Sequence, residues 1–455
     1  MSDVLRFIDD NLGRFRTELY DFLRIPSISA KSEHDGDTRS AAEWFSSRLG
    51  EAGLATEIVE TSGHPVVLGE WRGAGTEAPT VLIYGHYDVQ PPEPLELWES
   101  PPFEPTERDG RIYARGAADD KGQLYMHVKA LEAHFASGSK LPINVIVVAE
   151  GEEEVGSPNL VPFIEANRDR LACDLVLISD TGMFAEGLPS LLFSLRGLAY
   201  FEIHVHGARS DLHSGEYGGA VKNPGNALAQ IIASLHDADG KIAVPGFYDN
   251  VLEWDEETRS QIAGLPHTDE AFASDLEVPA LTGEAGFSTL ERLWIRPTCD
   301  VNGILCGYTG EGAKTVLPNH AMAKVSFRLV PDQNPDRVKK LLEAHLRTVE
   351  PEGVTLELTE LHGGRPWKAG VSGPAFDAAS EALKEAFGTT PVPMGGGGSI
   401  PIVVEFEEIL GATALLVGFS LPGCNLHAPN EWLPVENYEK GIGALALLYE
   451  KLGPG

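Results

Sequence analysis

The sequence predicts an α/β fold: a doubly wound, mostly parallel sheet with a smaller α+β domain inserted into it. Runs of apolar, mainly β-branched residues at 80–84, 143–149 and 174–178 indicate strands covered on both faces, and helical patterns separate them. From residue 192 the pattern changes to alternating apolar and polar residues, typical of a sheet with one solvated face. We therefore expect residues 1–191 and 365–455 to form one domain and residues 192–364 a second, inserted domain.

The individual elements follow from the spacing of apolar residues. Alternating three- and four-residue spacing predicts a first helix that stops before Pro26, and a second helix is expected over residues 38–52, ending at Gly53. We expect the other helices after residue 120 and near 158–167, 251–274, 375–387 and 437–452. The remaining strands are expected at 55–59, 65–71, 200–206, 323–330 and 414–417.

Composition excludes several classes of partner. The chain has 455 residues and a formal net charge of −33, so we expect no sequence-independent binding to nucleic acid or to an anionic membrane surface. The four cysteines show no Cys-x-x-Cys spacing, which favours a reducing compartment. With no apolar run long enough to span a membrane and no secretory pattern at the N-terminus, we expect a cytoplasmic protein.

Acidic and imidazole side chains follow the predicted buried strands or begin the helices after them. The strand at 143–149 leads into Glu150, Glu152, Glu153 and Glu154, which repel one another unless a cation lies between them. The carboxyl ends of parallel strands share one edge of a sheet, so distant residues can converge there. The candidates for this convergence are His86, Asp119, Glu153, Glu154, Asp180 and His427.

Each of these residues also has an ordinary structural interpretation. The glutamates could form a solvated acidic loop, and a single histidine could be a hydrogen-bonded core residue. Asp119 could cap a helix, and Asp180 could belong to a turn. If the residues do converge, two histidines with several carboxylates suit zinc, with manganese or cobalt as alternatives. Five ligands suit two ions better than one, and an adjacent glutamate that binds no metal could act as the base.

Several ordered motifs resemble the M20 metallopeptidase family, and in particular its carnosinase-like dipeptidases. The resemblance runs from about residue 27 to the last predicted helix. It is carried by five segments of the sequence: Gly85-His-Tyr-Asp-Val-Gln-Pro-Pro, Arg115-Gly-Ala-Ala-Asp-Asp-Lys-Gly, Glu150-Gly-Glu-Glu-Glu-Val-Gly-Ser, Asp211-Leu-His-Ser-Gly and His427-Ala-Pro-Asn-Glu.

The resemblance implies a role for each candidate at the metal centre. Asp119 would bridge two metal ions, and it would precede a cis peptide bond to Asp120. One ion would be completed by His86 and Asp180, and the other by Glu154 and His427. Glu153 would be the general base, and Asp88 would orient His86. Glu152 would be an exposed, variable position.

The resemblance also implies residues that contact the substrate. His213 would reach the active site of a partner subunit and stabilise the oxyanion, with a surface loop histidine as the alternative, so a homodimer through the inserted domain is expected. Arg328 would bind the substrate carboxylate, with a cross-strand salt bridge as the alternative. Asn302 and Thr315 match further family positions near substrate. Apart from the resemblance, the glycines at 395–398 can offer free N–H groups to an anion, so Ser399 could touch the substrate carboxylate, or could equally be a helix N-cap.

The expected activity is metal-dependent hydrolysis of the amide bond in a dipeptide or another small peptide. One alternative is an N-acyl-amino-acid deacylase that uses the same residues. A second is a catalytically silent binding protein on the same fold. A nucleotide-binding protein is a weaker alternative, because a Gly-x-Gly-x-x-Gly motif is missing at the first strand turn and no lysine follows residues 395–399 as in a P-loop.

Overall fold

The protein divides into two compact units in a computed structural model that describes residues 2–370, 372–398 and 400–453. The first unit comprises residues 1–192, 369–394 and 405–455, and the second comprises residues 193–368 and 395–404. The chain passes from one unit to the other several times, and three elements therefore contribute residues to both units. These elements are β8 (Ser190–Leu195), β16 (Val392–Gly396) and α12 (Ile402–Leu410).

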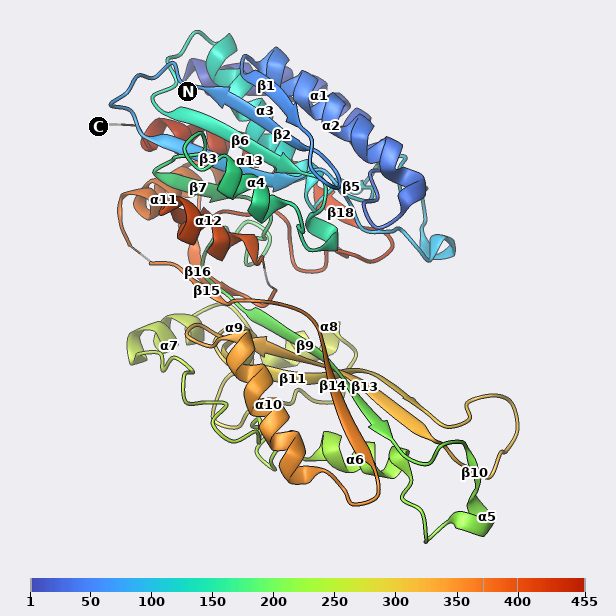
Figure 1. The fold of residues 1–455 in the computed structure, drawn as a ribbon. Coiled ribbons are helices and arrows are strands. Elements are labelled where there is room, and N and C mark those ends of the chain that lie inside the picture. Colours follow the sequence, from blue (N-terminus) through green and yellow to red (C-terminus); the bar gives the residue numbers. More distant parts are fainter. Residues whose placement is uncertain (1, 371, 399, 454–455) are drawn as a thin grey trace. The chain divides into compact units, whose positions relative to one another are not determined.

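The first unit contains a six-stranded sheet with the strand order β1-β2-β6-β3-β7-β17. Strands β6, β3, β7 and β17 run parallel, whereas β2 is antiparallel to β6 and β1 is antiparallel to β2. The elements of this unit (Figure 1) are α1 (Asp3–Leu23), α2 (Asp35–Ala52), β1 (Ala55–Val59), β2 (Val66–Trp71), β3 (Thr80–His86), β4 (Thr106–Arg108), β5 (Arg111–Tyr113), α3 (Lys121–Ala136), β6 (Asn144–Glu150), α4 (Leu160–Ala166), β7 (Leu175–Ile178), α11 (Pro374–Phe387), β17 (Thr413–Leu416), β18 (Trp432–Pro434) and α13 (Val435–Lys451).

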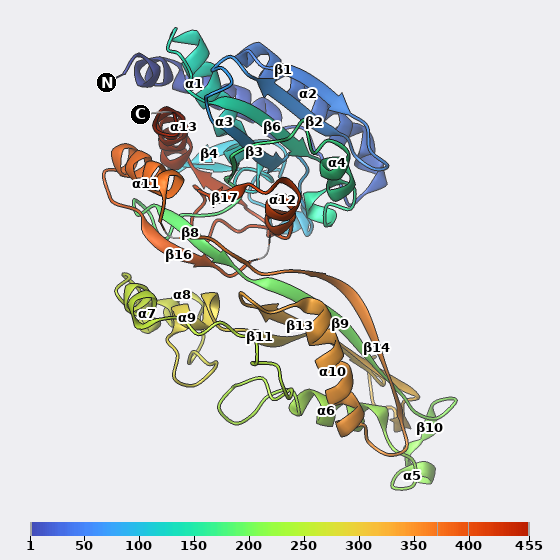
Figure 2. The ribbon, with the colours of Figure 1, turned by 60° about the vertical axis from the view of Figure 1, so that its left-hand side comes forward.

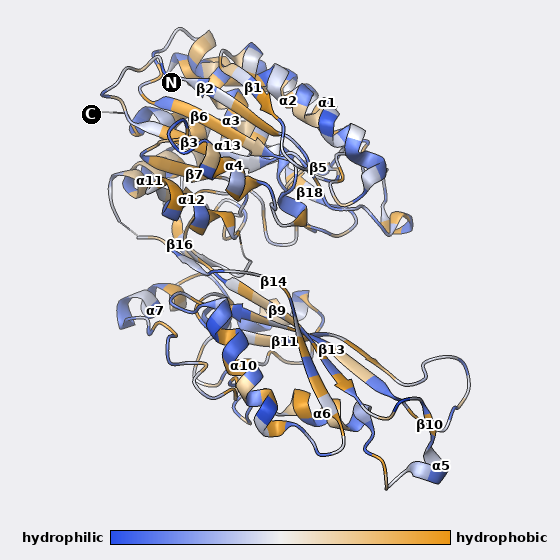
Figure 3. Cartoon of the chain, in the orientation of Figure 1, coloured by the Kyte–Doolittle hydropathy of each residue, from blue (hydrophilic) through white to orange (hydrophobic). Residues whose placement is uncertain are grey.

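Helices cover both faces of this sheet, which explains why its parallel strands are apolar along their length (Figure 3). Alternate residues of β3 and β6, such as Ile83 and Val147, share one core with α1, α2, α3, α11 and α13. Figure 2 shows the ribbons of these elements. On the other face, the ring of Tyr84 packs edge to face against Phe406 of α12. The buried parallel strands end in polar residues, so these residues lie at one edge of the sheet.

The second unit is built on a four-stranded antiparallel sheet with the order β11-β13-β9-β14. Helices α6 and α10 pack on one face, against the buried alternate residues of β9 such as Phe201 and Ile203. The elements are β9 (Gly197–His206), β10 (Leu212–His213), α5 (Ser214–Tyr217), α6 (Pro224–Ala233), α7 (Glu256–Ala263), α8 (Asp269–Asp275), α9 (Thr289–Trp294), β11 (Thr298–Cys306), β12 (Val316–Leu317), β13 (His320–Leu329), α10 (Pro335–Val349), β14 (Thr355–Gly364) and β15 (Trp367–Lys368).

The predicted fold class is confirmed: the larger sheet is mostly parallel and the alternating segment forms an antiparallel sheet with one polar face. The single helical region expected at 251–274 is wrong in detail, because Gly264 and Pro266 separate two short helices, α7 and α8. None of the helices in the described part of the chain has both the length and the apolar content of a membrane span.

Candidate metal centre

The candidate ligands lie at the edge where the parallel strands of the first unit end. His86 is the last residue of β3, and Asp180 follows β7 by two residues. Asp119 lies in the loop before α3, and its peptide bond to Asp120 is cis, as the resemblance implied. Glu154 lies in the short 3₁₀ helix η3 (Glu153–Val155) that follows β6. The sheet thus brings residues from four separate segments to one place.

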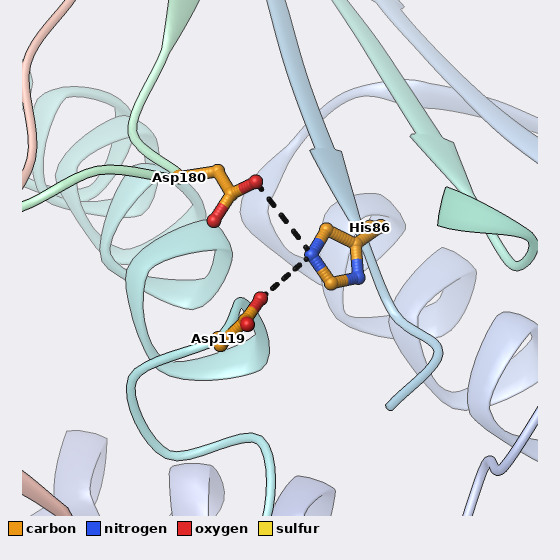
Figure 4. A group of neighbouring side chains, drawn as sticks. All are labelled: His86, Asp119 and Asp180. Atoms are coloured by element: carbon orange, nitrogen blue, oxygen red, sulfur yellow. Dashed lines mark hydrogen bonds and ion pairs between the residues drawn. The ribbon is translucent and has the colours of Figure 1, made fainter. Parts of the chain in front are cut away.

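His86, Asp119 and Asp180 form the first group (Figure 4). The Nε2 atom of His86 lies 3.1 Å from Asp119 Oδ1 and 3.9 Å from Asp180 Oδ2. The other ring nitrogen, Nδ1, lies 3.1 Å from the carbonyl oxygen of Asp88 and 3.3 Å from its Oδ1 atom. An Nδ1–H group that donates to Asp88 leaves the Nε2 lone pair directed at the two carboxylates, which is the tautomer that a metal ligand needs.

Asp119, Glu154 and His427 form the second group. The Nε2 atom of His427 lies 2.9 Å from Asp119 Oδ2 and 3.4 Å from Glu154 Oε2. Asp119 therefore belongs to both groups and faces a different histidine with each of its oxygens. His427 has a positive φ of 60°, an uncommon backbone conformation for a residue other than glycine.

Asp88 connects the first group to the glutamate segment. Its fully buried carboxylate accepts a 2.6 Å hydrogen bond from the Ser29 hydroxyl. It also accepts from the backbone N–H groups of Glu153 and Glu154, at 3.3 and 3.1 Å. One carboxylate therefore fixes the ring of His86 and the start of η3 together.

The ionisation of these groups reflects crowding of negative charge. Burial, reinforced by the neighbouring carboxylate of Asp119, raises the pKa of Asp180 to about 6 and that of Glu154 to about 9. The pKa of Glu153 is raised well above its usual value by burial and by Asp180 and Glu154. Burial also opposes the charge on Asp119, but the imidazoles of His427 and His86 outweigh the effect of burial and hold the pKa of Asp119 below its usual range.

The donor set fits divalent metal ions. Two nitrogen or oxygen ligands of one zinc ion, each at ~2.0–2.2 Å from it, lie roughly 3–3.6 Å apart, close to the separations observed in both groups. A cation would also offset the repulsion that raises the carboxylate pKa values. Next to Asp119, the buried Oδ1 atom of Asp120 has no hydrogen-bond partner among the described residues.

Glu431 ends the segment His427-Ala-Pro-Asn-Glu, and it organises the loop that carries Asp119. Its fully buried carboxylate pairs with Arg115 Nη1 at 2.6 Å. It also accepts hydrogen bonds from the backbone N–H groups of Gly116, Ala118 and Asp119, at 2.9–3.1 Å. Only its position four residues after His427 could have drawn attention to it.

The expectation that Glu152 is exposed is wrong. Its side chain accepts hydrogen bonds from the His64 backbone N–H at 3.2 Å and from Asn159 Nδ2 at 2.8 Å, and the residue is only 7% exposed.

Gln90 is a residue that sequence reasoning missed. Its Nε2 atom donates to Glu154 Oε2 at 2.7 Å, which holds that carboxylate in place.

The residues expected to contact the substrate, as far as the structure describes them, lie in the second unit. His213 is exposed on β10, and β10 pairs with β12, so that the Ser214 N–H donates to the Thr315 carbonyl oxygen at 3.1 Å. Arg328 lies on β13, and Asn302 lies at a bulge in the neighbouring strand β11. Ser399 lies outside the described residues.

The fold and the site define a metal-dependent hydrolase with an α/β catalytic unit. A family model for peptidase family M20/M25/M40 matches residues 82–451, which includes all of the candidate ligands. The chain therefore belongs to the M20 peptidase family, and it is an enzyme that uses divalent metal ions. This excludes the alternative of a catalytically silent binding protein.

Several relatives match nearly the whole chain. The Cys-Gly metallodipeptidase dug1 of Schizosaccharomyces pombe is 33% identical over 97% of this chain and 96% of its own length. The structure of human carnosine dipeptidase 1 is 29% identical, with a TM-score of 0.86 over 99% of this chain and 98% of that one. An M20 metallo-carboxypeptidase from Sulfolobus solfataricus is 35% identical, with a TM-score of 0.87 over 96% and 99% of the two chains.

Replacing Glu431 with Gln tests its role in the loop. The change leaves the buried guanidinium of Arg115 without its anionic partner, so we expect a loss of about 3–5 kcal/mol in the free energy of unfolding, measured by chemical denaturation. Glu436→Gln is the matched control, because Glu436 pairs with Lys440 on the surface, and it should cost less than about 1 kcal/mol. Equal losses in the two variants would contradict this role.

Proposed function

We propose that this chain hydrolyses the amide bond of dipeptides with a pair of divalent metal ions, most suitably zinc. Two groups of ligands that share one carboxylate support a pair of ions better than a single ion. The observation that carries the proposal is the position of Asp119, whose two oxygens face different histidines. His86 and Asp180 would complete one ion, and Glu154 and His427 the other.

The metal ions, when bound, would polarise the scissile carbonyl and lower the pKa of the attacking water. Glu153 would take the proton of that water and deliver it to the leaving amine. Its location supports this role, because its backbone N–H is held by Asp88, next to both ligand groups, and its raised pKa favours a carboxyl group that can carry a proton. Asp88 would keep His86 in the tautomer that binds metal.

His213 would stabilise the oxyanion of the tetrahedral intermediate. The Gly215 backbone N–H donates to its Nδ1 atom at 3.0 Å, so the neutral ring carries its proton on Nε2, where it can serve as a donor. We further propose that Arg328 binds the substrate carboxylate, with Asn302, Thr315 and Ser399 nearby. Support for Arg328, Asn302 and Thr315 is their match to family positions, and support for Ser399 is the preceding run of glycines, whose N–H groups can bind an anion.

We also propose a homodimer through the second unit and a cytoplasmic location. The support for the dimer is the resemblance, by which His213 acts on a partner subunit. The support for the location is the set of four cysteines, which are all free thiols in the structure.

A second candidate activity is that of a carboxypeptidase on longer peptides, favoured by the relative from Sulfolobus solfataricus that is so named. The relatives named as dipeptidases disfavour the N-acyl-amino-acid deacylase. Turnover of dipeptides, tripeptides, and acetylated or succinylated amino acids by the zinc-loaded enzyme separates these activities. We expect hydrolysis of dipeptides above all. Faster turnover of tripeptides or of acylated amino acids would overturn the proposal.

Glu153→Ala and Glu153→Gln test the general base. We expect metal content near that of the wild type and a fall in kcat of about 10²–10⁴, because only the proton transfer is lost. Glu165→Gln, which changes an exposed glutamate on α4, should keep wild-type activity. A near-normal rate in the Glu153 variants, measured alongside metal analysis, would remove Glu153 from this role.

Complementation tests whether His213 acts across the dimer. His213→Asn and Glu153→Gln should each be inactive alone. When the two chains are expressed together, a mixed dimer has one site with its own Glu153 and the partner's His213, so activity should return to part of the wild-type level. Co-expression without recovery, with mixed dimers verified by two affinity tags, would show that His213 acts within its own chain or not at all.

A further inference from the structure

Helix α3 carries two buried polar side chains whose partners lie next to the candidate ligands. Gln123 and His127 are four residues apart, so they lie on the same face of the helix, one turn from each other. Both side chains are almost completely shielded from solvent. A buried polar group costs free energy unless it is hydrogen-bonded, so the groups that these two side chains bind indicate their role.

The amide group of Gln123 joins two of the ligand segments. Its Nε2 atom donates to the carbonyl oxygen of Ala118 at 2.8 Å, and Ala118 directly precedes Asp119. Its Oε1 atom accepts from the backbone N–H of Phe419 at 2.7 Å, in the segment that leads from β17 to His427. Both ends of one planar amide group are therefore bound, and the width of that group sets the distance between the two backbone segments.

His127 binds the segment that carries Asp180. Its Nε2 atom lies 2.8 Å from the hydroxyl oxygen of Ser179, which directly follows β7 and directly precedes Asp180. Its Nδ1 atom lies 2.7 Å from the hydroxyl oxygen of Tyr449 on α13. Burial lowers the pKa of His127 to about 3, so the ring is neutral and offers one N–H group and one lone pair to the two hydroxyls. The ring thus links α13 to the residue before a candidate ligand.

A second buried histidine on α3, His134, provides a comparison. Its Nε2 atom donates to the carbonyl oxygen of Ala446 on α13 at 3.0 Å. The rings of His127 and His134 each lie 6.3 Å from the ring of Tyr449, measured between centroids. The two histidines therefore share a helix, a neighbouring ring and a buried environment, but the hydrogen bond of His134 holds two helices together, whereas His127 reaches a ligand segment.

We propose that Gln123 and His127 are positioning residues, which fix the backbone beside the candidate ligands and thereby raise the affinity of the centre for metal. This inference rests on the proposed pair of ions. His127 acts through Ser179 on Asp180, which belongs to the first group of ligands, so it supports one ion. Gln123 acts beside Asp119, which belongs to both groups, so it supports both ions.

Titration of chelator-treated, full-length protein with Zn²⁺ tests these roles, with the dissociation constants measured by competition with a coloured chelator. Groups that hold metal ligands in place typically contribute about 10–100-fold to metal affinity. We expect His127→Leu to weaken one of the two ions by about this factor and to leave the other near its wild-type value. Gln123→Met should weaken both. His127→Gln, whose amide nitrogen can replace Nε2 as a hydrogen-bonding group, should recover part of the loss.

His134→Leu is the matched control, and it should bind both ions with wild-type affinity. Ser179→Ala removes the hydroxyl that His127 binds with little change in volume, so it should weaken the same ion and serves as the test if His127→Leu does not fold. Equal affinities in the wild type, His127→Leu, Ser179→Ala and His134→Leu would overturn the proposal. A wild type that binds a single ion at this centre would overturn the proposed pair instead, and weaker binding by His127→Leu than by His134→Leu would still support the positioning role.

Discussion

The carboxylate of Asp119 is the constraint on which the metal centre depends. Its two oxygens lie within 3.1 Å of His86 and 2.9 Å of His427, residues from opposite ends of the chain. Around it, three further carboxylates have raised pKa values because burial and mutual repulsion disfavour their charges. Burying these carboxylates side by side costs free energy when no cation is present. Bound cations would offset that cost.

The rest of the first unit positions that carboxylate. Parallel strands bring His86 and Asp180 to one edge of the sheet, while Glu431 binds the loop before α3 through three backbone N–H groups. Asp88 ties His86 to the glutamate segment in the same way, through hydrogen bonds to backbone. Buried charges that accept hydrogen bonds from backbone groups therefore hold the candidate ligands in place.

The fold class and the gathering of the candidate ligands at one sheet edge could be predicted from the sequence, because both follow from the spacing of apolar residues. Buried strands that end in acids or histidine indicate a shared edge, and the fold class followed from the same runs. Glu152 shows the limit: in a tight 3₁₀ turn neighbouring side chains diverge, and spacing does not reveal which glutamate turns inward. Glu431 was missed because its partners are backbone groups more than 300 residues earlier, which leave no pattern in the sequence.

The central claim is that two ions share Asp119, and anomalous X-ray scattering at the zinc edge, from crystals of the zinc-loaded protein, tests it most directly. We expect two peaks ~3.5–4 Å apart, both adjacent to Asp119, with His86 at one and His427 at the other. A single peak among these side chains, or a pair with Asp119 at only one of them, would contradict it.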